Sequence, residues 1–287
     1  MPLPRSLPMI ATDQPAVLTC ALIGGFPSGN PNHPRTLDDI VREGVSAVRS
    51  GAAVLHIHAR TADGVGSQEA TVYREIGARI LAEVDDVILN YTTAGVPGMS
   101  DDERLRSLDA GPELASLDAG SMNFGPKILF VNSQAFIDRM AVEMGKRGIM
   151  PELECFDAGM VDTGRRLVER ELVATPPLFQ IVLGVEGGAP ARVDTLVHLV
   201  SLLPRGANWA AFAIGAHHFT MMGAVLAMGG HIRTGLEDVT RISRGVWAES
   251  NAQLVERAVR MCQDVGRPVA TPDQARELLG LPAHGVE

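Results

Sequence analysis

The sequence has little lysine, little cysteine and no long apolar run, and each shortage excludes something. Only two of its 25 basic residues are lysines, Lys127 and Lys146, which leaves almost no candidate for a Schiff-base mechanism. The three cysteines, Cys20, Cys155 and Cys262, are far apart and form no CxxC pair. Neither a disulfide framework nor a zinc ribbon is therefore indicated, and a reduced, cytoplasmic setting is expected.

No apolar stretch is long enough for a membrane span or a signal peptide, and proline interrupts the first residues. We therefore expect the mature chain to be the whole chain. The net charge is −9, with acidic and basic residues interspersed, so the surface lacks the basic field that nucleic acid or an anionic membrane would need. We expect neither as a partner, and an anionic substrate must meet a local basic site.

Length and composition indicate an ordinary globular protein with a large core. The chain has 287 residues, of which 46% are hydrophobic and 21% charged. An α/β barrel commonly closes on about 250 residues, so one domain with a modest extra arm fits the length.

Eight short apolar runs alternate with eight amphipathic segments along the chain. Nearly continuous apolar sequence is typical of parallel strands that are covered on both faces. The alternation predicts the α/β class and a (β/α)₈ TIM barrel, with a doubly wound open sheet as the alternative. No GxGxxG follows the first run, so a dinucleotide site is not supported. The predicted strands are Val17–Ile23, Ala52–His58, Val87–Thr93, Leu114–Gly120, Glu152–Asp157, Leu178–Gly184, Trp209–Gly215 and His231–Asp238.

Helix boundaries are marked by capping residues at several of the intervening segments. Thr36, Ser100, Ser133 and Ser250 are predicted N-caps, and Gly51, Gly111, Gly148 and Gly266 are predicted to close helices. The longest loop, from Gly24 to Arg35, follows the first strand, where barrels place functional residues. We expect one barrel domain over residues 1–287, with a short N-terminal lead and a C-terminal helical tail.

A histidine pair ends the second predicted strand. His56 and His58 alternate, so their imidazoles point to one face of the strand, and two neutral imidazoles suit a divalent metal. Glu237 ends the eighth strand, which neighbours the first in a closed barrel, and is a candidate third ligand. Arg233 and Asp238 lie beside it in sequence.

Further polar residues lie near the ends of other predicted strands. Glu152 and Glu154 share one face of the fifth strand, and Glu154 is a candidate to orient Arg233 or a substrate. The turn from Thr92 to Gly98 and Ser116 are weaker candidates for holding a carboxylate. His217 and His218 follow the seventh strand and are candidates for the barrel mouth or for support of the metal site.

Seven sequence blocks, in order and covering nearly the whole chain, resemble the β-keto acid cleavage enzymes, whose named member is the 3-keto-5-aminohexanoate cleavage enzyme. Seven ordered blocks are far more specific than a single HxH. They are Gly51–Arg60, Thr92–Gly95 with Gly98–Met99, Ala115–Gly125, Pro151–Asp157, Met228–Asp238, Ala248–Asn251 and Ala270–Asp273.

The resemblance implies a zinc-bearing barrel, usually a homotetramer, with His56, His58 and Glu237 as metal ligands. Another divalent ion would also fit this ligand set. It further implies acetyl-CoA as co-substrate of a 3-oxo acid, giving acetoacetate and a new acyl-CoA. Asp238 corresponds to the base that removes a proton from the carbon between ketone and carboxylate, and Arg233 tunes it. A carboxylate beside a guanidinium is expected to stay ionised at neutral pH.

The remaining correspondences concern the substrate. Thr92, Thr93 and Gly95 match a cradle for the substrate carboxylate, Ser116 a further polar contact, and Glu154 a supporting acid. Two positions depart from the family pattern. Phe26 stands where the aminohexanoate enzyme has a glutamate for the substrate ammonium, and Ala216 stands where an arginine is common. Burying an ammonium against Phe26 is unfavourable, so we predict an uncharged or apolar 3-oxo acid and poor use of 3-keto-5-aminohexanoate.

Two alternatives remain open. A metal-dependent hydrolase of the amidohydrolase type also uses an HxH, although usually on the first strand and with further histidines. The other is a non-catalytic barrel that binds a metal or an acyl-CoA without turnover.

Overall fold

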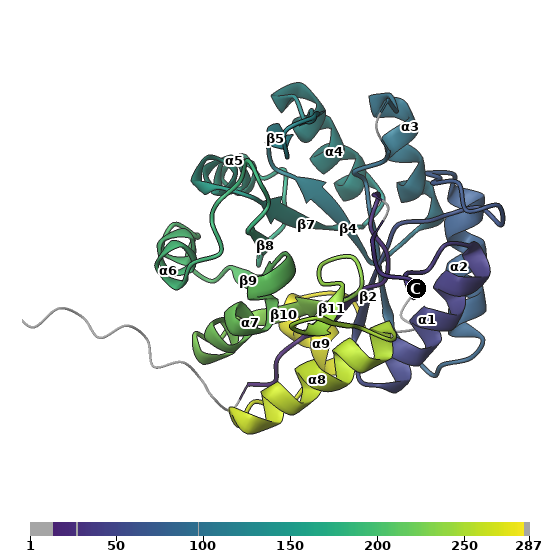
Figure 1. Ribbon diagram of the computed structural model, residues 1–287. Coiled ribbons are helices and arrows are strands. Elements are labelled where there is room, and N and C mark those ends of the chain that lie inside the picture. Colours follow the sequence, from purple (N-terminus) through teal and green to yellow (C-terminus); the bar gives the residue numbers. More distant parts are fainter. Residues whose placement is uncertain (1–13, 27, 97, 284–287) are drawn as a thin grey trace, which may run out of the picture.

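The computed structural model describes residues 14–26, 28–96 and 98–283, and within them eight parallel strands close into a barrel. Neighbouring strands follow the closed order β1-β10-β9-β8-β7-β4-β3-β2. Figure 1 shows the helices as a ring around these strands. The predicted (β/α)₈ barrel is confirmed, and the open-sheet alternative is wrong because β1 pairs with both β2 and β10.

All eight predicted runs contain a barrel strand. Most of these strands are buried along their whole length, because the core fills the inside and the helices cover the outside. The eighth strand ends four residues earlier than predicted, at Thr234, since Gly235 turns the chain. The strands are β1 Leu18–Ala21, β2 Val54–Ile57, β3 Ile88–Tyr91, β4 Leu114–Asp118, β7 Met150–Cys155, β8 Leu178–Leu183, β9 Asn208–Ala213 and β10 His231–Thr234.

The predicted helix signals work as expected. Thr36 and Ser100 form complete capping boxes, and Ser133 and Ser250 accept a hydrogen bond from the first turn of their helices. Each of the four predicted closing glycines has a positive φ. The helices are α1 Leu37–Arg49, α2 Ala70–Leu81, α3 Asp101–Leu105, α4 Gln134–Lys146, α5 Ala158–Glu169, α6 Val193–Ser201, α7 His218–Ala227, α8 Asn251–Asp264 and α9 Pro272–Leu279, with 3₁₀ turns η1 Arg106–Ala110 and η2 Gly215–His217.

The C-terminal helix α9 closes the bottom of the barrel, where the strands begin. Ala275 and Leu279 pack in one buried cluster with the first residues of several strands, including Val54, Ile88 and Leu178. The buried guanidinium of Arg276 lies between the carboxylates of two loops on the same side. The predicted C-terminal tail is thus part of the barrel's packing. Most of the predicted N-terminal lead lies outside the described residues.

Two short antiparallel hairpins stand in the loops that follow barrel strands at the opposite end. One pairs β5 Met122–Phe124 with β6 Ile128–Phe130, and the other pairs β11 Arg241–Ser243 with β12 Val246–Trp247. The sequence analysis predicted neither hairpin. Among the described residues, no helix combines the length and the apolar character that crossing a membrane requires.

Candidate active site

His56 and His58 lie on the inner face at the end of β2. Because successive side chains on a strand alternate, both rings point the same way, and their centroids are 5.3 Å apart. His56 is almost fully buried and His58 is slightly exposed. A Cβ on Gly25 would lie 3.6 Å from the ring of His58, so the loop after β1 passes directly beside this pair.

Glu237 reaches the same point from the turn that follows β10. Gly235 has a φ of 148° and a Cβ there would lie 2.0 Å from the carbonyl oxygen of Ala21, so only glycine fits this turn. The amide of Glu237 bonds the carbonyl of Ala21, which fixes the turn against β1. The carboxylate is thereby directed toward the barrel axis.

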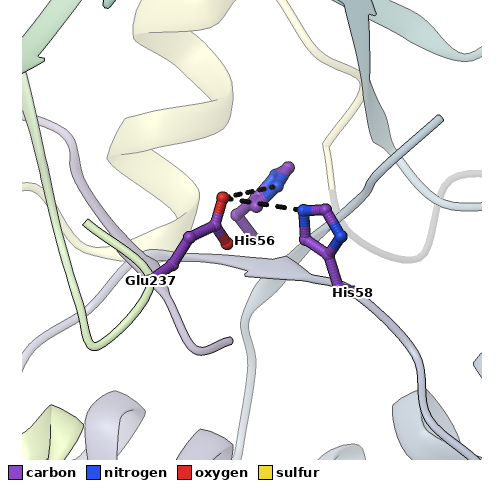
Figure 2. Close-up of side chains that lie close together, drawn as sticks. All are labelled: His56, His58 and Glu237. Carbon is purple, nitrogen blue, oxygen red and sulfur yellow. Dashed lines mark ion pairs between the residues drawn. The ribbon is translucent and has the colours of Figure 1, made fainter. Parts of the chain in front are cut away.

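The carboxylate of Glu237 points at both imidazoles (Figure 2). Its Oε1 lies 3.9 Å from His56 Nε2 and 3.6 Å from His58 Nε2. One ligand atom from each of the three residues lies within 4.8 Å of the others. The predicted three-residue cluster is therefore assembled as the sequence indicated.

The chemistry of this cluster fits a divalent cation. Burial lowers the pKa of His56 to about 3, so its ring is neutral and able to bind a metal. Burial alone would raise the pKa of Glu237, but Arg233 and the two histidines lower it well below its usual range. Glu237 Oε2 and His56 Nδ1 are buried without a hydrogen-bond partner among the described residues. A cation beside Glu237 would satisfy its free oxygen.

Arg233, on β10, joins three carboxylates at the floor of the barrel mouth. It donates to Asp238 through Nε at 3.0 Å and Nη2 at 3.0 Å, to Glu154 through Nη1 at 2.9 Å and to Glu237 through Nη2 at 2.7 Å. Its guanidinium carbon lies 4.4 Å from the ring centroid of Phe212. The predicted relation between Arg233, Glu154 and Asp238 is present as direct hydrogen bonds.

Asp238 has an unusual protonation balance. Burial raises its pKa to about 7, although Arg233 acts in the opposite direction. Arg233 therefore does not keep Asp238 fully ionised at neutral pH, contrary to the expectation from sequence. A carboxyl group that titrates near neutrality is suited both to accept and to return a proton.

These groups face a cavity of about 750 Å³ at the end of the barrel where the strands end. Its polar end includes His58, Glu154, Arg233, Glu237 and Asp238. The remaining lining is largely apolar and contains five of the eight phenylalanines of the chain: Phe26, Phe124, Phe130, Phe156 and Phe212.

The proposed carboxylate cradle is divided between the cavity surface and the wall behind it. Thr92 and Gly95 line the cavity. Thr93 and Ser116 are buried and bond one another, with Thr93 Oγ1 donating to the carbonyl of Ser116 at 2.7 Å. The structure thus brings Thr92 and Gly95 to the cavity and does not bring Thr93 and Ser116 to its surface.

Sequence reasoning missed two charged groups of the cavity wall. Asp118 ends β4 and lines the cavity, and burial raises its pKa. Arg104, on α3, also lines it, and its Nε donates to the carbonyl of Thr93. A charged residue at the end of a barrel strand is the signal that would have identified Asp118. Nothing in the sequence around Arg104 indicates that its side chain turns inward.

The two histidines after β9 lie away from the cavity. His217 and Ala216 are exposed. His218 is buried between strand and helix, where its ring bonds the carbonyl of Ala213 at 2.8 Å and Thr234 Oγ1 at 2.9 Å. Neither histidine is among the residues that line the mouth, so that expectation is wrong for both.

Comparison with known proteins gives a consistent result. The family model described as beta-keto acid cleavage enzyme matches residues 15–281. A 3-keto-5-aminohexanoate cleavage enzyme from Fusobacterium nucleatum is 39% identical over 92% of this chain and 97% of its own length. A 3-oxoadipate:acetyl-CoA acetyltransferase from Cupriavidus necator is 34% identical over 96% of this chain and 98% of its own. The apo structure of ObcA shares the fold with a TM-score of 0.73 and 22% identity, over 88% of this chain and 66% of that one.

Proposed function

Because this chain belongs to the β-keto acid cleavage enzyme family, we propose that it exchanges acyl groups between a 3-oxo acid and acetyl-CoA. The products are acetoacetate and a new acyl-CoA. The observation that carries the proposal is the contact of Arg233 with both Asp238 and Glu237, which joins a titrating carboxyl group to the His56–His58–Glu237 cluster. Relatives named for acetyl-CoA-dependent transfer from 3-oxo acids support the same reaction.

The reaction balances without an external oxidant or reductant. A proton leaves C2 of the 3-oxo acid, and the resulting carbanion attacks the acetyl carbonyl, which expels the CoA thiolate. The thiolate adds to the original C3 ketone, and the C2–C3 bond breaks to release the new acyl-CoA. The carbanion left on acetoacetate takes a proton back. No lysine takes part, which suits a chain with two.

Asp238 is proposed as the group that takes and returns the proton at C2, and its pKa of about 7 suits both directions. Arg233 holds Asp238 in place through two hydrogen bonds, and Glu154 fixes the far side of the guanidinium. Thr92 and Gly95 are proposed to hold the substrate carboxylate at the cavity surface, with Thr93 and Ser116 bracing that wall from behind.

His56, His58 and Glu237 are proposed to hold a divalent cation, zinc in the first place. When bound there, such an ion supplies Lewis acidity toward the substrate carbonyl. The orientation of these ligands depends on their surroundings. Asn90, beside His56 in the register of β2 and β3, donates to Glu152 at 2.7 Å and thereby stiffens the wall next to the ligand.

A homotetramer and a cytoplasmic location are further parts of the proposal, which rest on the family resemblance and on composition. All three cysteines are buried and unpaired, in keeping with a reducing compartment. Size-exclusion chromatography with light scattering measures the oligomeric state directly.

The function is tested by incubating the purified protein with acetyl-CoA and a panel of 3-oxo acids, and by measuring acetoacetate and the new CoA ester. Formation of both, in equal amounts and only with acetyl-CoA, is expected. Cleavage without acetyl-CoA would favour a hydrolase. A bound metal with no product from any acid would favour a non-catalytic binding protein.

A further inference from the structure

An aromatic wall forms one side of the cavity; we use this name for Phe26, Phe124, Phe130 and Phe156. Phe26 stacks on Phe124 with ring centroids 5.4 Å apart and an interplanar angle of 26°. Phe124 also meets Phe130 at 6.5 Å and Phe156 at 6.4 Å, both edge to face. Three separate segments contribute these rings, which are the loop after β1, the β5–β6 hairpin and the end of β7.

The aromatic wall begins directly beside the proposed reacting centre. A Cβ on Gly24 would lie 3.0 Å from Glu237 Cγ, and one on Gly25 would lie 3.6 Å from the ring of His58. Phe26 is the next residue along this loop. A 3-oxo acid whose ketone lies at the histidine cluster and whose carboxylate lies at Thr92 and Gly95 has one remaining part, the substituent on C3. The wall is the adjacent surface that is free to receive it.

Charge is unevenly placed around the cavity. The buried acids and Arg233 lie at the polar end, where they bond one another. At the wall itself, Glu186 is the carboxylate that lies near the hairpin, and its side chain is exposed to solvent. A solvated carboxylate contributes little to holding an ammonium against phenylalanine.

The rings at the wall still have apolar surface to cover. Phe26 is 39% exposed, and Phe124 and Phe130 are half-buried, whereas Phe156 is buried. Covering such surface with a hydrocarbon substituent is favourable, and each methylene buried gives about a fourfold gain.

We propose that the native 3-oxo acid carries an apolar substituent of about four or more carbons on C3, a phenyl ring included, which packs against Phe26 and Phe124. This inference rests on the proposed function and adds its substrate class. The two phenylalanines set the specificity, while the transfer chemistry belongs to the polar end.

The test is a comparison of kcat/KM for 3-oxohexanoate, 3-oxooctanoate, 3-oxo-3-phenylpropanoate and 3-keto-5-aminohexanoate with acetyl-CoA. We expect 3-oxooctanoate to exceed 3-oxohexanoate by about tenfold or more, at about fourfold per methylene. The phenyl acid is expected to rank with the longer chain and the amino acid to rank last. An amino substrate equal to or better than 3-oxohexanoate would overturn the inference while leaving the reaction established. Failure of all four acids to give acetoacetate would overturn the proposed function and the inference with it.

Three variants separate specificity from folding. Phe124→Leu is expected to reduce the advantage of the longer and phenyl acids at least fivefold while 3-oxohexanoate changes little. The matched control is Phe219→Leu, because Phe219 packs under Arg257 outside the cavity lining. Phe26→Glu is expected to shift the preference toward the amino substrate. An unchanged ranking in Phe124→Leu and Phe26→Glu, with melting temperatures like that of the wild type, would refute the role of the wall.

Glu186→Gln tests the other charged group at this position. We expect the ratio between the amino acid and 3-oxohexanoate to stay the same. A selective loss of the amino substrate in this variant would show that Glu186 receives an ammonium, and it would overturn the inference.

Discussion

Arg233 and Asp238 meet side-on, with two parallel hydrogen bonds of 3.0 Å from Nε to Oδ2 and from Nη2 to Oδ1. This bidentate geometry fixes the carboxyl plane as well as its position. Burial still raises the pKa of Asp238 to about 7. The pair thus combines a fixed orientation with a proton that is neither fully held nor fully lost at neutral pH.

Replacing Asp238 with asparagine should remove the proton acceptor while keeping the shape of the site. We expect kcat/KM to fall about 100-fold to 10,000-fold, the usual contribution of a positioned general base. Metal content should stay at the wild-type level, because the His56–His58–Glu237 cluster is untouched. Steady-state kinetics and elemental analysis check the two parts, and a variant that retains most of its activity would contradict the assigned role.

Removing the metal should abolish turnover, and adding zinc should restore it. His58→Ala is expected to weaken metal affinity by more than the roughly 10-fold to 100-fold that loss of an outer partner costs. The matched control is His198→Ala, on the exposed face of α6. Elemental analysis after dialysis, together with the metal-dependent rise in melting temperature, measures the effect. Equal metal content in both variants would argue against the site.

Stability should fall with acid because of His231, whose Nδ1 accepts the backbone N–H of Val17 at 3.1 Å. Burial lowers the pKa of His231 from 6.5 to about 4, so the unfolded chain binds the proton first as the pH falls. The folded state therefore loses stability between pH 6.5 and 4 and gains none above this range. Between pH 7 and 5 the loss from this group is about 2 kcal/mol.

His231→Asn is the comparison for this effect, because asparagine keeps an acceptor and does not titrate. Urea unfolding at pH 7 and pH 5 should show a smaller drop in the free energy of unfolding for the variant. An identical drop in both proteins would mean that other groups carry the acid sensitivity.

Arg276 should contribute strongly to the stability of the barrel bottom. It donates to Asp86 at 2.5 and 2.8 Å and to Glu113 at 2.6 and 3.0 Å, and its own side chain is buried. Arg276→Met should cost about 2 kcal/mol, because it leaves two carboxylates that remain partly exposed to water. Thermal unfolding measures the loss. The control is Arg192→Met, which removes an exposed pair with Asp194 and should change little.

The sequence predicted those parts of the site that depend on periodicity and chain order. His56 and His58 could be paired because alternation on a strand puts both rings on one face. Glu237 could be added because the eighth strand of a closed barrel returns beside the first. The same rules predicted every barrel strand, since a strand covered on two sides must be apolar throughout.

What the sequence did not predict depends on depth and on partners chosen in three dimensions. Thr93 and Ser116 lie one layer behind the cavity surface because their hydroxyl and backbone groups satisfy one another. His218 turns from the mouth because Ala213 and Thr234 offer buried acceptor and hydroxyl groups. The Phe26–Phe124 stack joins a loop and a hairpin almost 100 residues apart, a distance over which local pattern carries no information.

The seal that α9 places under the strands has a kinetic consequence. Traffic through the barrel has a single doorway, so the acid and the thioester arrive, and both products depart, past the same rim. Acetoacetate that lingers there blocks the next acid, and inhibition by accumulated product follows from the architecture itself.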